Sequence, residues 1–200
     1  MADNIEFWFD FTSPYSYLAT RKVEEVGQTT GREVVWRPFL LGVVFKETGN
    51  RPLLDQPIKG AYAKQDLPRM ARYLKMPWSR PENFPILTIA AQRAYYAIER
   101  NDPAAAKAFA KRAFATYFGQ GTDISSTKTV VGIAAEDGID PAALETDLGD
   151  DAVKQIVKDR TAEAVERGVC GAPFFFVGDQ GFWGSDRLWM VKKWIQRGGW

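Results

Sequence analysis

Two serines, a lone cysteine and the absence of histidine limit the chemistry open to this chain of 200 residues. Ser13 and Ser16 lie three residues apart, just after the apolar run 5–9. Cys170 is the only cysteine, so neither an internal disulfide nor a Cys-x-x-Cys pair can form. Without histidine the chain has no Ser-His-Asp or Cys-His catalysis and no histidine-based zinc site. An enzyme of this composition would use a carboxylate, a lysine or a reactive group brought in by a cofactor.

Ser13 has the features of a residue that begins a helix. Serine is a preferred N-cap, and Pro14 suits the first helical position, where its missing N–H costs nothing. The preceding run 5–9 predicts a buried strand, and we expect the helix to continue to about Gly27. The Ser13 hydroxyl would then lie at the positive end of a helix dipole, where an anion is stabilised. From this stretch alone, an ordinary helix cap is the simpler interpretation.

Composition excludes several classes of protein. With 46% apolar and 14% aromatic residues, the chain can bury a sizeable core. A formal net charge of +1 and the lack of a basic run argue against nucleic acid as a partner. The apolar runs are too short to span a bilayer, and the first residues carry no export signal. A single cysteine fits a reducing compartment, so we expect a cytoplasmic protein with no membrane partner.

The order of predicted elements indicates an α/β fold. A strand at 33–40 completes a β-α-β unit, for which a parallel pair with a right-handed crossover is the default. Strand patterns then disappear, and Pro68 should break or kink the first of the helical patterns that follow. Those helical patterns cover 59–75, 86–100, 103–118, 125–136 and 140–148. The chain ends with a helix at 151–167, a strand at 172–178, a turn at 179–181, a strand at 182–184 and a helix at 187–196.

This order, β-α-β followed by helices and then α-β-β-α, is that of a thioredoxin-like fold with an inserted all-helical domain. We expect residues 1–45 and 150–200 to form the thioredoxin-like domain and residues 46–149 to form the insertion. In this fold two places carry function. One is the start of the first helix, where Ser13 stands and where Ser16 takes the second position. The other is the loop before the third strand, where Ala172-Pro173 matches a cis-proline.

Several motifs in the same order give the chain a family resemblance. They are the stretches at 9–18, 48–52, 59–67, 171–175 and 182–188. Together they resemble the DsbA-like superfamily and, within it, the kappa-class glutathione transferases and the 2-hydroxychromene-2-carboxylate isomerases. The resemblance implies a glutathione site in which Ser13 donates its hydroxyl to the thiolate rather than acting as a covalent nucleophile. The residues that it implies for glutathione are Ser13, Ala172, Pro173, Trp183, Gly184, Ser185 and Asp186.

The substrate side is less specified. The resemblance places Asn50, Lys59 and Phe84 toward cofactor or substrate, with Lys59 suited to a carboxylate, although a solvated surface lysine is the simpler alternative. The aromatic residues that could line a pocket, with plain core as their alternative, are Phe39, Phe45, Trp78, Phe84 and Tyr95. Better-matched isomerases carry polar or basic groups where this chain has 43–45, which leaves the substrate open. Cys170 is expected to be a small buried apolar residue.

The implied activity is a glutathione-dependent isomerase that converts 2-hydroxychromene-2-carboxylate to trans-o-hydroxybenzylidenepyruvate in aromatic hydrocarbon degradation, by reversible addition of the thiolate. A small aromatic carboxylate and glutathione are its expected ligands, and a homodimer its expected state. Two alternatives stay open, a kappa-like glutathione transferase and a non-catalytic module that binds glutathione or a peptide. A dithiol oxidoreductase is nearly excluded, because neither Ser13 nor Ser16 can form a disulfide.

Overall fold

A mixed β-sheet forms the centre of the part of the chain that positions Ser13. The computed structural model describes residues 3–200. The strands β1 (Ile5–Phe9), β2 (Val34–Pro38), β3 (Phe174–Val177) and β4 (Gln180–Trp183) lie in the order β2-β1-β3-β4. β1 pairs parallel with β2 and antiparallel with β3, and β3 pairs antiparallel with β4. The parallel pair needs a crossover, which α1 (Pro14–Thr30) provides.

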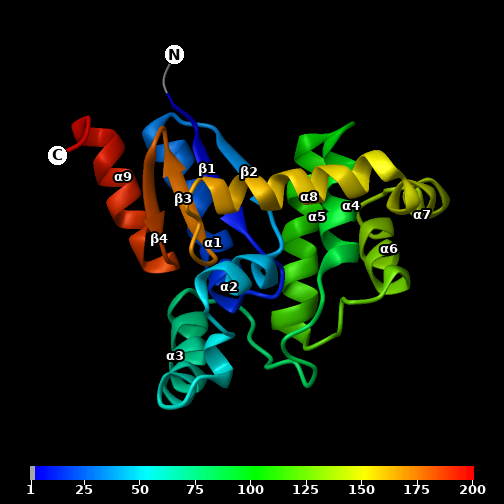
Figure 1. Ribbon diagram of the computed structural model, residues 1–200, viewed down its shortest axis with the longest axis horizontal. Coiled ribbons are helices and arrows are strands. Elements are labelled where there is room, and N and C mark those ends of the chain that lie inside the picture. Colours follow the sequence, from blue (N-terminus) through cyan, green and yellow to red (C-terminus); the bar gives the residue numbers. More distant parts are fainter. Residues whose placement is uncertain (1–2) are drawn as a thin grey trace.

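Helices cover both faces of the sheet (Figure 1). Successive side chains of a strand point to opposite faces. Phe7 and Phe9 of β1 therefore join the core that α1 and α9 (Leu188–Arg197) complete, with α9 contributing Leu188. Trp8 points the other way, into a second cluster with Phe174, beneath α8 (Asp151–Glu166). The expected thioredoxin-like fold is confirmed by this arrangement.

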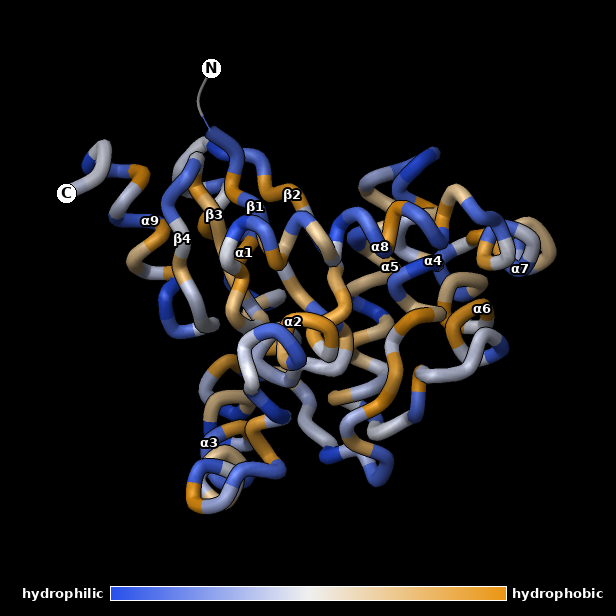
Figure 2. The backbone as a smooth tube through the Cα atoms, viewed as in Figure 1, coloured by the Kyte–Doolittle hydropathy of each residue, from blue (hydrophilic) through white to orange (hydrophobic). Residues whose placement is uncertain are grey.

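The segment between β2 and α8 is helical, as predicted. Its helices are α2 (Leu41–Thr48), α3 (Lys59–Tyr73), α4 (Ile89–Glu99), α5 (Pro103–Phe114), α6 (Thr127–Ala135) and α7 (Pro141–Gly149). A 3₁₀ turn at Leu53–Asp55 precedes α3, and a π turn at Ala115–Gly119 follows α5. Figure 2 shows hydrophobic residues along β3 and hydrophobic and hydrophilic residues alternating along the turns of the helices. The ring of Phe11, just after β1, lies 5.1 Å from that of Phe114, so sheet and helices share one continuous core.

Local capping signals identified several helix starts. The Ser13 side chain accepts from an N–H of α1, and the Asp102 and Asp140 side chains accept from two N–H groups each at the starts of α5 and α7. Ser126 does the same for α6. Serine and aspartate are preferred N-caps and a proline follows both Asp102 and Asp140, so the sequence predicts these starts, with Ser125 as the alternative to Ser126. Among residues 3–200, no helix is long and apolar enough to cross a membrane.

Helix ends and the last hairpin differ from the prediction. α1 continues past Gly27 to Thr30, and Gly31, with a φ of 64°, forms its left-handed cap. Gly27 serves packing instead, because a Cβ there would lie 2.6 Å from Cγ2 of Val34. Val177 pairs with Gln180, so the hairpin turn consists of residues 178–179 and precedes the predicted position.

Two further expectations were wrong, and one helix was not predicted. Of the expected break or kink at Pro68, the break does not occur, because α3 runs through Pro68 to Tyr73. The pair Ser185-Asp186 before the helix at 187–196 predicts an N-cap, but residues 185–187 form a 3₁₀ turn and no side chain caps α9. The unpredicted helix is α2, whose residues 41–48 span the boundary expected between 45 and 46.

Candidate functional site

The Ser13 side chain joins the start of α1 to the loop that leads into β3. Its Oγ accepts a hydrogen bond from the backbone N–H of Ser16 at 3.1 Å, which is the capping bond. The same hydroxyl donates to the backbone carbonyl of Ala172 at 2.8 Å. Ser13 is only 4% exposed, so its hydroxyl has a fixed environment at the positive end of the helix.

The loop opposite Ser13 carries the predicted Ala172-Pro173 bond, which is cis. The carbonyl of Pro173 accepts the backbone N–H of Gly184 at 3.0 Å, which ties this loop to the end of β4. A Cβ on Gly171 would lie 2.5 Å from Nε1 of Trp183, so the indole packs directly over this glycine. The loop, Trp183 and Gly184 therefore form one wall beside Ser13.

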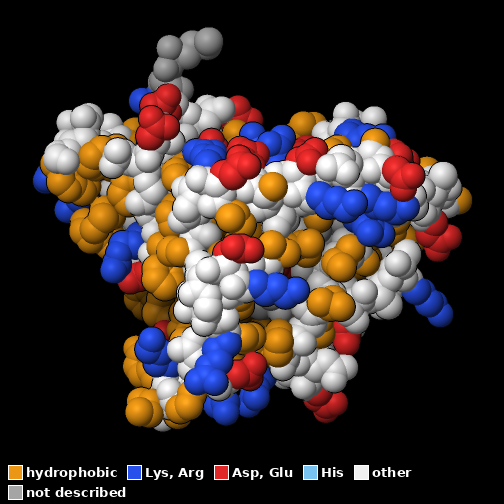
Figure 3. Space-filling view, viewed as in Figure 1, with side chains coloured by type: hydrophobic (Ala, Val, Ile, Leu, Met, Phe, Trp, Pro, Cys, Tyr) orange, Lys and Arg blue, Asp and Glu red, His pale blue; other side chains and the backbone are white. Residues whose placement is uncertain are grey.

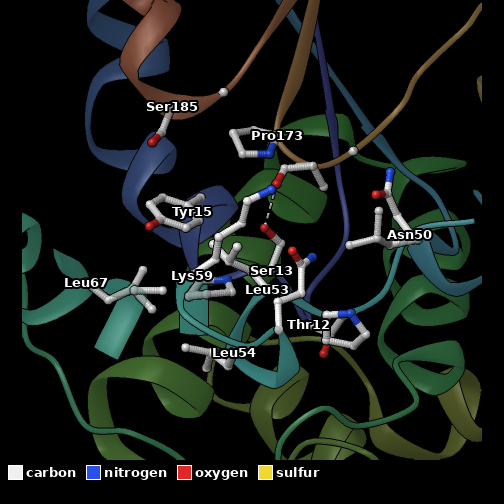
Figure 4. Close-up of a pocket in the computed structure, with 18 of the residues that line it drawn as sticks. Thr12, Ser13, Tyr15, Asn50, Leu53, Leu54, Lys59, Leu67, Pro173 and Ser185 are labelled. Carbon is white, nitrogen blue, oxygen red and sulfur yellow. Dashed lines mark hydrogen bonds between the residues drawn. The ribbon is translucent and has the colours of Figure 1, made fainter. Parts of the chain in front are cut away.

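A cavity of about 700 Å³ opens next to the Ser13 hydroxyl. Figure 4 shows Tyr15 and Ser185 on one side of the Ser13–Ala172 hydrogen bond and Asn50 on the other. The cavity brings together all the residues that the resemblance implied for glutathione and substrate: Ser13, Asn50, Lys59, Phe84, Ala172, Pro173, Trp183, Gly184, Ser185 and Asp186. Segments distant in the sequence thus meet at the start of α1.

Charged groups of both signs line the cavity. Arg51 and Lys59 reach it from the loop after α2 and from the start of α3. Asp66 of α3 and Asp186 of the 3₁₀ turn bring carboxylates, and Asp186 forms an ion pair with Arg187 at 2.5 Å. The outer surface of the molecule also mixes the two signs, with basic and acidic side chains interspersed over the face in Figure 3. The cavity therefore offers partners for cations and for anions.

A tyrosine–aspartate cluster in the cavity wall was not predicted. The Tyr15 hydroxyl donates to Oδ2 of Asp66 at 3.2 Å, and the Tyr62 hydroxyl donates to Oδ1 of the same residue at 3.2 Å. Burial, followed by the nearby Asp66 carboxylate, raises the pKa of Tyr15, so its phenol stays protonated at neutral pH. All three residues lie within the motifs 9–18 and 59–67. Tyr62 and Asp66 are one helical turn apart in α3, but no local signal connects Tyr15 to them.

A buried carboxylate anchors the loop that carries Ser13. Asp10 is 3% exposed, and its Oδ1 accepts the backbone N–H of Thr12 at 3.0 Å and the hydroxyl of Thr88 at 2.6 Å. Its Oδ2 accepts the backbone N–H of Leu41 at 2.8 Å. The backbone carbonyl of Asp10 also accepts the N–H of Ser13 at 2.9 Å. Burial raises the Asp10 pKa, although these hydrogen bonds oppose that effect.

The predicted aromatic pocket is only partly correct. Phe45 and Phe84 line the cavity. Phe39 and Tyr95 are 0% and 1% exposed and belong to the two core clusters, Phe39 to that of Trp8 and Tyr95 to that of Phe9. Trp78 stacks on the ring of Phe118 at 5.8 Å and is not among the residues that line the cavity.

Cys170 differs from the expectation of a buried residue. It is half-buried and lines the cavity. Burial raises the pKa of its thiol, which disfavours the reactive thiolate. The expectation that Cys170 is an uncharged residue without a redox role is therefore consistent with its raised pKa, but the side chain lies in the cavity wall and not in the core.

Comparisons with known proteins agree with this architecture. A family model described as a DSBA-like thioredoxin domain matches residues 4–196. The 2-hydroxychromene-2-carboxylate isomerase of Pseudomonas putida is 31% identical over 193 residues, covering 94% of this chain and 92% of that protein. The isomerase of the same name from Sphingobium xenophagum is 31% identical, covering 98% of this chain and 99% of that protein.

A more distant relative is glutathione S-transferase kappa 1 of Caenorhabditis elegans, 26% identical over 96% of this chain and 91% of that protein. Among solved structures, a 2-hydroxychromene-2-carboxylate isomerase matches with a TM-score of 0.87 and 29% identity, covering 96% of this chain and 94% of that one. The chain therefore belongs to the DsbA-like thioredoxin-domain family and, within it, to the 2-hydroxychromene-2-carboxylate isomerase family.

Proposed function

We propose that this protein is a glutathione-dependent isomerase that converts 2-hydroxychromene-2-carboxylate to trans-o-hydroxybenzylidenepyruvate. The observation that carries the proposal is the Ser13 hydroxyl, held at the positive end of α1 beside a cavity of about 700 Å³. Relatives that bear the isomerase name at 31% identity over nearly the whole chain support it. The reaction belongs to the degradation of aromatic hydrocarbons, and we expect a cytoplasmic homodimer.

The residues of the cavity fit glutathione. A serine hydroxyl at a helix N-terminus suits a thiolate, because both the hydroxyl proton and the helix dipole stabilise negative charge. Asp186, with Ser185 beside it, suits the ammonium of the γ-glutamyl end, and Trp183 with Gly184 forms the adjoining wall. The protein's own thiol, Cys170, has a raised pKa and is a poor source of thiolate.

When bound, glutathione supplies a sulfur nucleophile that adds to the substrate and leaves again, so it is not consumed. The task of Ser13 is to turn its hydroxyl proton from the carbonyl of Ala172 toward that sulfur. A hydrogen bond to a charged group contributes about 1.5–3 kcal/mol, and each unit of lowered thiol pKa corresponds to about 1.4 kcal/mol. The backbone carbonyl of Ala172, once released from Ser13, can pair with an extended peptide.

Other residues hold the substrate. Lys59 is the cation that we assign to its carboxylate, and Asn50 adds amide donors at the opposite side of the cavity. Phe84, with Phe45, supplies apolar surface for an aromatic ring. These groups bind and orient the substrate beside Ser13, where the bond between ring and side chain can rotate.

The experiment is an isomerase assay with the purified protein, run with glutathione, without it, and with S-methylglutathione. We expect turnover only with glutathione, because S-methylglutathione can fill the site but has no thiol. Ser13→Ala should lower kcat about 10- to 100-fold while glutathione still binds, since one donor to a developing anion is lost. Equal turnover without glutathione would contradict the proposal.

The alternatives give different outcomes. A kappa-like transferase, suggested by the relatives of that name, would yield a stable conjugate rather than a rearranged product. A non-catalytic module would bind glutathione tightly, show no turnover, and be unaffected in binding by Ser13→Ala. Product analysis by mass spectrometry, with calorimetry for glutathione, separates the three.

A further inference from the structure

The carboxylate of Asp66 is engaged by the protein itself rather than presented to a ligand. Each of its oxygens accepts a tyrosine hydroxyl at 3.2 Å, one from Tyr15 of α1 and one from Tyr62 of α3. Arg69 approaches Oδ1 at 3.4 Å, and the Asp66 side chain is only 15% exposed. Asp66 therefore acts as an internal acceptor, and the bond from Tyr15 joins α3 to the helix that begins at Ser13.

The first half of α3 packs on the 3₁₀ turn at Leu53–Asp55, since a Cβ on Gly60 would lie 2.4 Å from the carbonyl oxygen of Leu54. The buried residues of this half of α3 are Gly60 and Ala63, which contribute little apolar surface. Pro68 has no N–H, so the helical hydrogen bond to the carbonyl of Lys64 is missing. The helix continues through this missing bond to Tyr73.

The start of α3 is also discontinuous. Ile58, the residue before Lys59, has a φ of 65°, an unfavourable conformation for a β-branched residue. The N–H of Lys59 bonds the carbonyl of Pro57 at 2.7 Å, which closes a γ-turn around Ile58. Residues 59–67 thus begin at a strained turn, and the Tyr15–Asp66 bond is the polar contact that ties them to α1.

Lys59 and Asp66 lie on the same face of this helical segment. They are seven residues apart, or about 10.5 Å along the axis, and both line the cavity. Tyr15 follows Ser13 by two residues and lines the same cavity (Figure 4). The Tyr15–Asp66 bond thereby sets the distance between the two helices and the place of Lys59 relative to Ser13.

We propose that Tyr15 and Asp66 are positioning residues that hold Lys59 over the cavity and so give it its preference for an anionic substrate. The proposal rests on the proposed function, in which Lys59 meets the substrate carboxylate. In this proposal the Tyr15 hydroxyl affects substrate binding by fixing the position of Lys59, and it does not contact the reacting atoms.

A double-mutant cycle tests this. Four proteins are compared: the wild type, Tyr15→Phe, Lys59→Met and the double variant. Tyr15→Phe should raise KM for the chromene carboxylate about 3- to 10-fold, the range of one lost hydrogen bond, with kcat within about twofold. In the Lys59→Met background, Tyr15→Phe should change KM less than about twofold, because Lys59 is no longer there to be positioned.

A matched control and a binding assay sharpen the cycle. Tyr73→Phe removes a hydroxyl from a tyrosine of the same helix that is 79% exposed, and it should leave KM unchanged. Calorimetry with salicylate and the neutral 2-hydroxybenzyl alcohol reports the anion preference without turnover. Tyr15→Phe should weaken salicylate binding about 3- to 10-fold and leave the alcohol unaffected. If Tyr15→Phe is poorly folded, Asp66→Asn replaces it in the same cycle.

Three results would overturn the proposal. If the fold-increases in KM caused by Tyr15→Phe and Lys59→Met multiply in the double variant, the two residues act independently. Equal weakening of salicylate and the alcohol would indicate a general structural role. Weaker glutathione binding in Asp66→Asn with unchanged salicylate binding would make Asp66 a ligand for glutathione. Absence of isomerase turnover would contradict the proposed function alone, because the salicylate cycle still reports on Lys59.

Discussion

Asp10→Asn is the substitution that most directly tests how the Ser13 loop is held. The Asp10 carboxylate accepts one hydrogen bond from each of Thr12, Leu41 and Thr88, at 2.6–3.0 Å, inside the protein. An asparagine oxygen in the Oδ1 position can keep the bonds from Thr12 and Thr88. Its NH₂ group then meets the N–H of Leu41, so one bond is lost and two donors face each other.

The magnitude follows from these contacts. A hydrogen bond to a charged group contributes about 1.5–3 kcal/mol, and a buried N–H without an acceptor costs about 1–3 kcal/mol. Removing the charge also removes the unfavourable burial that raises the Asp10 pKa, which offsets part of the loss. We therefore expect Asp10→Asn to lower the free energy of unfolding by about 2–4 kcal/mol at neutral pH.

Urea unfolding followed by tryptophan fluorescence measures this change. The matched control is Asp179→Asn, an exposed residue in the β3–β4 turn, which should change stability by less than about 0.5 kcal/mol. Because Leu41 begins α2, Asp10→Asn should also speed hydrogen exchange of the α2 amides relative to the wild type, and this increase should be larger than that for the β1 amides. An Asp10→Asn protein as stable as the wild type would refute the view that this carboxylate anchors the loop.

Three further results are expected. Burial raises the folded-state pKa of Asp10 above its unfolded value of about 3.9. The free energy of unfolding should therefore fall as the pH rises from about 3.9 through the folded-state pKa. Urea titrations at several pH values should show this fall in the wild type and not in Asp10→Asn. Gly27→Ala should destabilise by about 1–3 kcal/mol in thermal unfolding, because the new Cβ meets Val34 at 2.6 Å. Gly171→Ala should leave stability nearly unchanged but displace the exposed Trp183 indole, seen as weaker glutathione binding and altered fluorescence.

Helix starts were predictable from the sequence where the cap is local. Ser13-Pro14 and Asp140-Pro141 place a side-chain acceptor and a proline next to the first turn, and both helices begin there. α2 has no such signal, because its N-cap is Leu40 and Val43 and Val44 favour strands. The N–H of Leu41 is satisfied by Asp10, 31 residues away, and a contact of that range has no local signature.

The candidate site divides in the same way. Residues next to the recognisable motifs, such as Ser13 and Ser185, line the cavity as expected. The Tyr15–Asp66 contact joins residues 51 positions apart, and residue type alone does not indicate that they meet. Aromatic residues posed the opposite difficulty, because Phe39 and Phe45 look equivalent in sequence while only Phe45 faces the cavity.

Capping a helix and stabilising a thiolate are compatible for Ser13 because they use different parts of one hydroxyl. The cap uses an oxygen lone pair, which accepts the N–H of Ser16. The proton is separate, and in this structure it goes to the carbonyl of Ala172. Turning it to a thiolate exchanges a neutral bond of about 0.5–1.5 kcal/mol for a charged one of about 1.5–3 kcal/mol.

The net gain from that exchange is about 1–1.5 kcal/mol, which corresponds to about one unit of thiol pKa. A free thiol has a pKa of about 8.5, so Ser13 alone would bring it to about 7.5. Lowering the thiol pKa below about 7.5 requires further stabilisation of the thiolate, and the N-terminus of α1 can provide it. An anion at a helix N-terminus gains about 0.3–1 kcal/mol in exposed sites and more when partly buried. For the proposed isomerase, the strand-to-helix turn that buries Ser13 therefore contributes to the chemistry alongside the hydroxyl.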